Sequence, residues 1–419
     1  MAFAIEWLEK RALFPQLIFE SPDPQTGIII VVPAFDEPDI TCLLDSLASC
    51  DIPDCRTEVI IVVNAPPGAD SKSLINNRIC VERIKSWKEI NASSFFSLFA
   101  IDAGQPFIDG WGVGLARKTG MDEALRRFST IGNPDGVIVS LDADCTVGKN
   151  YFTSLCKELY RNKKRKACAI GFEHPLSGDE FPDDVYRHII MYELHMRYFY
   201  QAVRNTGYPY AFHTVGSAMA CKASAYLKAG GMTRNQAGED FYFTQKLAPQ
   251  GGFFQLRSAV VHPSPRTSSR VPFGTGVIIS KLMQSRSSLL TTYDPAAFAE
   301  LKNMFSDICN LYSAGDDKLG SSYNDLSSGI KTFVSFTEWS ARISEIKRNT
   351  AGSKSFQKRF FGWFNMLKIV RYLNHVHSGI YKKVPVNDAA FSLLSDMGYS
   401  IKTKEPYDLL MCFRALEKQ

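Results

Sequence analysis

The sequence predicts an α/β protein with a mostly parallel central sheet flanked by helices, followed by a mainly helical C-terminal extension. Short runs of β-branched residues recur along the first part of the chain, and segments with apolar residues at the helical period separate them. Strands that alternate with helices in this way pair in parallel through right-handed crossovers, in a Rossmann-like arrangement. Beyond residue 280 the chain becomes more polar and less strand-like, which predicts the helical extension.

The first predicted strand spans residues 27–33, where isoleucine and valine follow one another without a polar interruption. Such a run is typical of a strand that is buried on both faces. A helix is expected next, because apolar residues recur at positions 40, 43, 44 and 47. Asp36 or Glu37 can cap its start, and Pro38 suits its first turn.

Further strands are predicted at 58–64 and 99–102. A glycine-rich segment from residue 110 then leads into a helix that ends near residue 128 and has a face of small residues: Ala116, Gly120 and Ala124. The remaining elements are a strand that ends at the acidic pair 142/144, a strand at 167–172, a helix from about 183, a helix at 241–247 and a strand at 253–261. Ligands of such sheets bind at the carboxyl ends of the strands, which places Asn64, Asp102 and the acidic pair along one edge.

Two carboxylates, Asp142 and Asp144, follow the apolar run 136–141. Side chains two apart on a strand share one face, so we expect these carboxylates to lie close together. Like charges at that distance favour the neutral forms unless a cation lies between them. Mn²⁺ or Mg²⁺ is the natural partner, since both bind carboxylate and phosphate oxygens. The alternative is that the pair only caps the next helix.

A second acidic pair, Glu239 and Asp240, opens the predicted helix 241–247. The helix macrodipole keeps a carboxylate ionised at this place, which suits a structural cap or a general base equally. His262 follows at the end of the last predicted strand. It is a candidate metal ligand, with a hydrogen-bonded core histidine as the alternative.

Arg266 and Arg270 lie among small residues and glycines in the segment 265–276. Two guanidinium groups in such a segment can fold over a diphosphate. The alternative is an ordinary mobile basic loop.

Composition limits the class of protein. The formal charge of +5 is small for 419 residues, so it does not indicate a nucleic-acid partner, although it suits an anionic substrate. The ten cysteines are scattered, without a C-x-x-C pair, and no apolar run is long enough to span a bilayer. We therefore expect a reduced, cytoplasmic protein.

Taken together, the motifs resemble those of the family 2 glycosyltransferases of GT-A fold. The resemblance covers residues 27–276 and rests on Val-Val-Pro-Ala-Phe-Asp-Glu at 31–37, Gly-Leu-Ala-Arg-Lys at 114–118, Asp-Ala-Asp at 142–144, Gly-Gly-Met at 230–232 and Gly-Glu-Asp at 238–240. It implies a donor that is a nucleoside-diphosphate sugar and an acceptor hydroxyl on a saccharide or a lipid-linked sugar. It also implies a role in the synthesis of cell-surface glycans or glycoconjugates.

The resemblance also implies roles for individual residues. Those that would bind the donor are Pro33, Phe35, Glu37, Asn64, Asp102, Arg117, Lys118, Asp142, Arg266 and Arg270. Asp144 would hold the metal, with Asp142 beside it and His262 as a further ligand. Asp240 would be the base of an inverting transfer, and Glu239 would contact the acceptor.

Some features leave alternatives open. Asn-Ala-Pro-Pro-Gly at 64–68 departs from the acidic or serine-rich turn of many family members, so the base preference stays open. A nucleotidyltransferase of sugar phosphates and a non-catalytic scaffold that binds a nucleotide sugar are the rival functions. The first usually has a basic, glycine-rich loop after its first strand, which is lacking here.

The densest basic run, residues 161–166, is expected to be a solvated helix end, with peripheral contact to a phospholipid surface as the alternative. The predicted organisation is an N-terminal leader at 1–26, a glycosyltransferase-like domain at 27–280 and a mainly helical region at 281–419.

Overall fold

The computed structural model describes residues 2–37, 39–92, 94–104, 111–233, 238–268, 274–284, 290–313, 315 and 319–419. It divides into two compact units. The first contains the chain up to Pro175 and the stretch His213–Pro265, and the second contains Leu176–Phe212, the residues from 266 to 268 and the described chain after Gly274.

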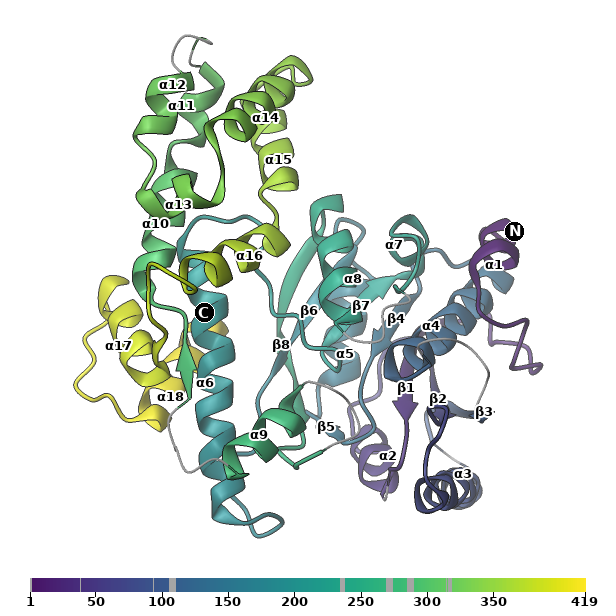
Figure 1. Cartoon of the computed structure of the whole chain (residues 1–419). Helices are drawn as coiled ribbons and strands as arrows, with labels where there is room; N and C mark the ends of the chain where they lie inside the picture. Colours follow the sequence, from purple (N-terminus) through teal and green to yellow (C-terminus); the bar gives the residue numbers. More distant parts are fainter. Residues whose placement is uncertain are drawn as a thin grey trace. The chain divides into compact units, whose positions relative to one another are not determined.

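The first unit is built on an eight-stranded sheet with the order β3-β2-β1-β4-β7-β6-β8-β5 (Figure 1). Its strands are β1 (Thr26–Ala34), β2 (Arg56–Asn64), β3 (Phe96–Gly104), β4 (Val137–Ser140), β5 (Cys145–Val147), β6 (Ala167–Phe172), β7 (Met219–Lys222) and β8 (Phe253–Pro263). The strands β3, β2, β1 and β4 pair in parallel, as do β6 and β8. The pairs β4–β7, β6–β7 and β5–β8 are antiparallel. The prediction of a mostly parallel sheet is confirmed.

The helices of the first unit connect and flank these strands. They are α1 (Ile5–Arg11), α2 (Thr41–Ala48), α3 (Ser71–Ile90), α4 (Val113–Thr130), α5 (Tyr151–Leu155) with a π-helical turn at Cys156–Tyr160, α7 (Ala223–Lys228) and α8 (Glu239–Leu247) with a 3-10 turn at Ala248–Gln250. The helix α4 packs on β1 and β2 with its small face. A Cβ atom at Gly120 would lie 2.4 Å from Cγ1 of Val31, so only glycine permits this approach.

Two features of the first unit differ from the sequence predictions. The helix α2 begins at Thr41 with Ile40 as its N-cap, later than expected, so neither Asp36, whose φ is 51°, nor Glu37 caps it. Pro38, expected in its first turn, lies outside the described residues. The short strands β5 and β7 were not predicted, since three or four residues carry no readable periodicity.

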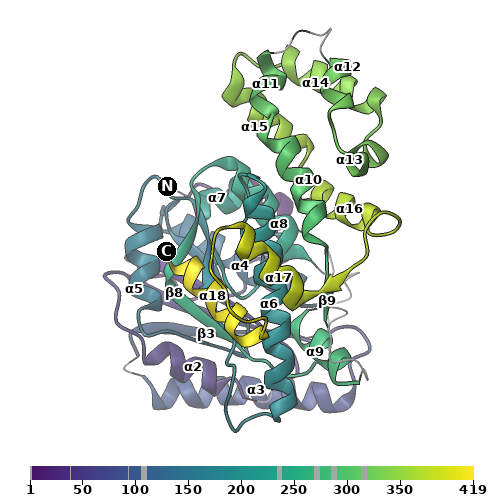
Figure 2. The same ribbon diagram turned by 90° about the vertical axis from the view of Figure 1, so that its left-hand side faces the viewer.

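The second unit is mainly helical. It contains α6 (Asp183–Asn205), α9 (Thr275–Gln284), β9 (Thr291–Thr292), α10 (Pro295–Ser306), α11 (Ile308–Ser313), α12 (Leu319–Asn324), α13 (Ser328–Phe333), α14 (Phe336–Arg348), α15 (Ser353–Trp363), α16 (Met366–Val376), β10 (Val384–Pro385), α17 (Val386–Asp396) and α18 (Pro406–Lys418). Figure 2 shows α17 and α18 lying along α6, and both pack on it. The helical C-terminal extension is confirmed, and α6 joins it from within the predicted 27–280 segment. Among the described residues, no helix has the length and apolarity to cross a membrane.

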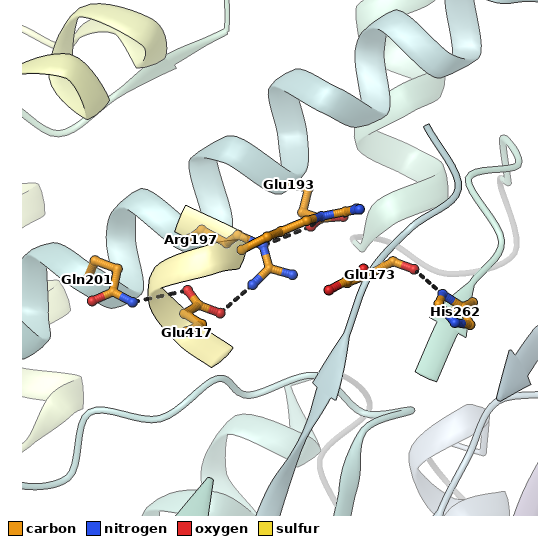
Figure 3. Close-up of polar contacts among 7 residues, drawn as sticks. Glu173, Glu193, Arg197, Gln201, His262 and Glu417 are labelled. Carbon is orange, nitrogen blue, oxygen red and sulfur yellow. Dashed lines mark hydrogen bonds and ion pairs between the residues drawn. The ribbon is translucent and has the colours of Figure 1, made fainter. Parts of the chain in front are cut away.

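A buried ionic network fastens α18 to α6 (Figure 3). Oε1 of Glu193 accepts hydrogen bonds from Nε of Arg197 at 2.8 Å and from Nε of Arg414 at 2.7 Å. Nη1 of Arg197 also pairs with Glu417, which accepts a further hydrogen bond from Nε2 of Gln201 at 3.2 Å. Because Glu193 is fully buried, its two arginine partners supply the charge that makes its burial tolerable.

Candidate functional site

Arg117 brings two of the predicted acidic residues together. Its Nη2 donates to Oδ1 of Asp142 at 2.6 Å, and its Nη1 pairs with Oε1 of Glu239. Arg117 belongs to α4, Asp142 to the loop between β4 and β5, and Glu239 to the first turn of α8. Burial opposes the charge of the guanidinium, but the carboxylates of Asp142, Glu239 and Asp240 raise the pKa of Arg117. The arginine is therefore a permanently charged centre that joins three elements.

Gly216, which was not predicted from the sequence as a site residue, makes room for this guanidinium. A Cβ atom at Gly216 would lie 3.1 Å from Nη2 of Arg117 and 3.3 Å from its Cζ. The carbonyl of Gly216 in turn accepts a hydrogen bond of 2.6 Å from Oγ of Ser140 at the end of β4. The glycine backbone thus covers the arginine, and any larger residue there would push against it.

Asp240 lies next to this cluster and has a raised pKa. Asp240 is the second residue of α8, whose N-cap is Gly238 with a φ of 70°, and its own Oδ1 accepts the backbone N–H of Phe241 at 2.7 Å. Burial, followed by the charge of Glu239, raises the pKa of Asp240 to about 6, against the opposing effect of Arg117. A carboxylate with this pKa is ionised at neutral pH and is more basic than an ordinary aspartate, which suits a general base.

The pair Asp142 and Asp144 lies in a loop and not on a strand, which corrects the prediction. The strand β4 ends at Ser140, so the shared-face argument does not apply. Backbone hydrogen bonds hold the loop in place instead. The N–H of Leu141 donates to Val31 at 3.1 Å, that of Cys145 to Asp142 at 3.2 Å and that of Ser264 to Asp144 at 3.2 Å. The loop is therefore tied to both β1 and the end of β8.

His262 lies in β8, opposite Thr146 of β5. Its Nδ1 is 2.9 Å from the backbone carbonyl oxygen of Glu173 (Figure 3). A carbonyl can only accept, so Nδ1 donates to it, and in the neutral ring Nε2 is then the nitrogen with the lone pair. A carbonyl on one ring nitrogen is the arrangement that orients a metal-binding histidine through the other.

The donor set fits Mn²⁺ or Mg²⁺ in part. Asp144 offers a carboxylate and His262 an imidazole nitrogen, but Asp142 is held by Arg117. Among the residues that the structure describes, no three histidine, cysteine or acidic side chains are grouped closely enough to hold a metal ion. A cation here would therefore need further oxygen ligands, such as those of a diphosphate.

The predicted donor-binding residues at the ends of β1, β2 and β3 share one edge of the sheet because these strands run in parallel. Pro33 is buried within β1, Phe35 is partly buried and Glu37 is buried in the loop that follows. Asp102, in β3, is exposed. At the end of β2, Asn64 is 2% exposed, and its Oδ1 accepts no hydrogen bond from the described part of the chain. A buried acceptor of this kind can receive a ligand N–H or O–H.

Two asparagines of α3, not predicted from the sequence, support this edge. Nδ2 of Asn77 donates to the carbonyl of Asn64 at 2.8 Å, and its Oδ1 accepts the backbone N–H of Asp36 at 2.9 Å. Nδ2 of Asn76 donates to Oδ1 of Asp36 at 2.7 Å. These contacts fix the left-handed backbone of Asp36 and thereby the loop after β1. The sequence alone does not show these asparagine contacts, because they depend on the tertiary packing of α3.

The structure does not place Lys118, Arg266 and Arg270 in the cluster around Arg117, although all three were predicted to bind the donor. Nζ of Lys118 is buried and pairs with Asp122 at 2.8 Å, and Asp122 also accepts the hydroxyl of Tyr226 at 2.7 Å. These contacts give Lys118 a structural role inside the first unit. Arg266 belongs to the second unit. Arg270 lies outside the described residues.

No protein-family model matches this chain, and no curated protein does. Among solved structures, S. aureus TarS 1–349 in complex with UDP-GlcNAc has 15% identity and a TM-score of 0.37, over 94% of this chain and 88% of that one. The mannosyltransferase PcManGT from Pyrobaculum calidifontis, with GDP-Man and Mn²⁺, has 13% identity and a TM-score of 0.33, over 99% and 90%. Glucosyl-3-phosphoglycerate synthase from Mycobacterium tuberculosis has 14% identity and a TM-score of 0.33, over 64% and 84%. With TM-scores below 0.5, these likenesses carry no part of the functional proposal.

Proposed function

We propose that this protein is a metal-dependent glycosyltransferase of GT-A fold, similar to family 2, which moves a sugar from a nucleoside-diphosphate sugar to an acceptor hydroxyl. One observation carries the proposal: Arg117 holds Asp142 and Glu239 beside Asp240, whose pKa is raised to about 6. A positioned carboxylate of this basicity, next to a fixed cation and at the ligand-binding edge of a parallel sheet, fits proton removal from an alcohol during group transfer.

The donor nucleoside is proposed to lie along the ends of β1, β2 and β3. Asn64 can accept a hydrogen bond from the base or the ribose through its buried Oδ1. Phe35 and Glu37 line the loop that Asn77 holds in place, and Asp102 presents an exposed carboxylate for a ribose hydroxyl. Because Asp142 is anchored by Arg117, it can accept a further ribose hydroxyl without moving.

The transfer is proposed to proceed by one displacement. Asp240 accepts the proton of the acceptor hydroxyl as that oxygen forms a bond to the anomeric carbon. The bond from this carbon to the diphosphate oxygen breaks, and the nucleoside diphosphate leaves with the electron pair. A single displacement inverts the anomeric centre. Glu239, fixed by Arg117, is placed to orient the acceptor.

Asp144 and His262 would hold the divalent cation, which would neutralise charge on the leaving diphosphate when bound. The hydrogen bond from Nδ1 of His262 to the carbonyl of Glu173 orients the ring, so that Nε2 is the nitrogen that would bind the cation. The proposed acceptor is a saccharide or a lipid-linked sugar at the cytoplasmic side, in the synthesis of a cell-surface glycan or glycoconjugate.

A thermal-shift screen with UDP, GDP, CDP and dTDP sugars, each with Mn²⁺ or with EDTA, tests the donor class. We expect one nucleotide class to stabilise the protein only when metal is present, and to release nucleoside diphosphate on incubation. Pyrophosphate release from a nucleoside triphosphate and a sugar phosphate would show a nucleotidyltransferase instead. Binding without any turnover, with a range of acceptors present, would show a scaffold.

A further inference from the structure

Tyr226 is a buried residue of α7 whose contacts reach the helices α1, α4 and α8 of the same unit (Figure 1). Its hydroxyl donates to Oδ1 of Asp122 in α4 at 2.7 Å. Its ring packs edge-on against Trp7 of α1, with ring centroids 6.0 Å apart, and against Phe243 of α8, with centroids 5.6 Å apart. This one side chain therefore links α4 to α8.

The contacts on the α4 side hold the Tyr226 ring in one orientation. Asp122, which accepts the hydroxyl, also binds Nζ of Lys118 through both carboxylate oxygens, at 2.8 and 3.1 Å. The same Nζ lies 5.3 Å from the ring centroid of Trp7. A Cβ atom at Gly231 would come within 2.8 Å of the Trp7 ring, so a side chain there would displace it. Because Lys118 and Asp122 are buried, water does not compete for their contacts.

The contact on the other side lies on the helix that carries the proposed base. Phe243 is 1% exposed and lies about one turn beyond Asp240 in α8. In a closely packed interior, its contact with Tyr226 limits how far α8 can shift or rotate. The ion pair between Glu239 and Arg117 also ties α8 to α4. The position of the proposed base therefore depends on an aromatic contact as well as on an ion pair.

We propose that Tyr226 is a positioning residue of the transfer reaction, which acts through Phe243 to fix the place of Asp240 beside the arginine. This inference rests on the proposed function, since Asp240 is the base of that reaction. A misplacement of about 1 Å at a reacting group can lower a rate by about 10²-fold. A loosened α8 would therefore reduce turnover, while the strand ends that are proposed to bind the donor stay in place.

The variant Tyr226→Leu tests the proposal, because it keeps an apolar side chain but removes the ring and the hydroxyl. We expect kcat for release of nucleoside diphosphate to fall by about tenfold to a hundredfold, with KM for the donor within about twofold of the wild type. Tyr226→Phe keeps the ring against Phe243 and should have a kcat within about threefold of the wild type. The double variant Tyr226→Leu, Phe243→Leu should be no slower than the slower single variant, since both changes break one contact.

The matched control is Tyr372→Leu in the second unit. Tyr372 is also fully buried, its hydroxyl donates to a carboxylate oxygen of Glu300 at 2.5 Å, and its ring centroid lies 5.7 Å from that of Phe333 in the same edge-on geometry. The substitution creates a comparable cavity and a comparable loss of stability. It should change kcat by less than about twofold, because Tyr372 does not act on α8.

A second measurement does not require turnover. Burial and the charge of Glu239 raise the pKa of Asp240 to about 6 against the effect of Arg117, and Asp142 raises it further to a smaller extent. In Tyr226→Leu the less firmly packed α8 lets water reach Asp240, so this pKa should move towards that of an ordinary aspartate. The difference in free energy of unfolding between the proteins with Asp240 and with Asp240→Asn changes between pH 4 and pH 8. In the Tyr226→Leu background this change should fall to less than about half. If the wild type turns over no nucleotide sugar, the proposed function fails, but this measurement still tests the positioning role.

Four outcomes would overturn the proposal. One is a folded Tyr226→Leu protein with the kcat of the wild type, and another is an unaltered pH dependence in its background. Equal losses of kcat in Tyr226→Leu and Tyr372→Leu would mean that only general stability matters. Equal losses in Tyr226→Leu and Tyr226→Phe would mean that the ring contact does not position α8. If Tyr226→Leu does not fold, Phe243→Leu tests the same contact from α8, and the kcat of the wild type in that variant would also contradict the proposal.

Discussion

At the scale of single residues, the site depends on one arginine that pairs with two carboxylates and interacts electrostatically with a third. Asp142, Glu239 and Asp240 were predicted as charged residues where a strand ends or a helix begins, whereas Arg117 was predicted only through the resemblance to the glycosyltransferase motifs. The sequence does not show that the arginine is the centre of the group. That fact depends on the side chain of Arg117, which reaches Glu239 in α8 and lies against Gly216, far away along the chain.

The raised pKa of Asp240 predicts a pH-dependent gain in stability for Asp240→Asn. The folded protein disfavours the ionised carboxylate, so the wild type loses stability as pH rises from about 4 to above 6, and the amide does not. The variant should resemble the wild type in free energy of unfolding at pH 4 and exceed it by about 1–3 kcal/mol at pH 8. Urea unfolding at both pH values measures this difference. If the difference in free energy of unfolding between the two proteins does not change with pH, the raised pKa of Asp240 is contradicted.

The same pKa predicts the pH dependence of catalysis. Asp240 must be ionised to accept a proton, so kcat/KM should rise with pH and level off above a midpoint of about 6. Steady-state release of nucleoside diphosphate, measured between pH 4.5 and 8.5, gives this profile. A rate that is already constant from pH 4.5 upwards would mean that an ordinary carboxylate, or none, acts as the base.

At the scale of elements, the buried parallel strands were the most readable part of the chain. The strands β1, β2 and β6 are buried almost throughout and are encoded by apolar runs that match them within a few residues. The strands β5 and β7 were not predicted from the sequence. Each is defined by its pairing with a neighbouring strand of the sheet, β8 for β5 and β4 for β7. The antiparallel pairing of β5 with β8 nevertheless ties the Asp142–Asp144 loop to the strand of His262.

This pairing predicts a metal-linked role for His262. His262→Ala should fold normally, since the side chain is only partly buried, but should weaken the Mn²⁺-dependent stabilisation by the donor by about tenfold or more in apparent affinity. Titration of the donor at fixed Mn²⁺, followed by thermal shift, measures the effect. In the presence of EDTA, the thermal shift caused by the donor should be the same in the variant and in the wild type. If both proteins bind the donor with equal affinity in the presence of Mn²⁺, His262 has only a structural role.

At the scale of the whole molecule, the sequence predicted a helical C-terminal region but not which earlier helix would join it. Amphipathic spacing identifies α6 as a helix, but its partners lie about 200 residues further along the chain, where Arg414 reaches Glu193. Long-range pairing of this kind has no local sequence signature. The boundary near residue 280 between the two predicted domains stays a prediction.

The Glu193 network predicts that the second unit depends on this pairing. Glu193→Ala leaves Arg197 and Arg414 buried without their shared carboxylate and should destabilise the unit by about 3–5 kcal/mol. The control Glu345→Ala removes an exposed pair with Arg342 and should cost less than about 1 kcal/mol. Urea unfolding and limited proteolysis at α18 report the two effects. Similar losses in both variants would contradict the role of the buried network.

The most direct test of the central claim is to measure donor binding and turnover in Asp240→Asn with the nucleotide sugar that the screen identifies. We predict that Mn²⁺-dependent donor binding stays within about twofold of the wild type, while release of nucleoside diphosphate falls by about 10²-fold or more. This result would show that the carboxylate beside Arg117 acts in the chemical step. Unchanged turnover, or loss of donor binding, would contradict its role as the base.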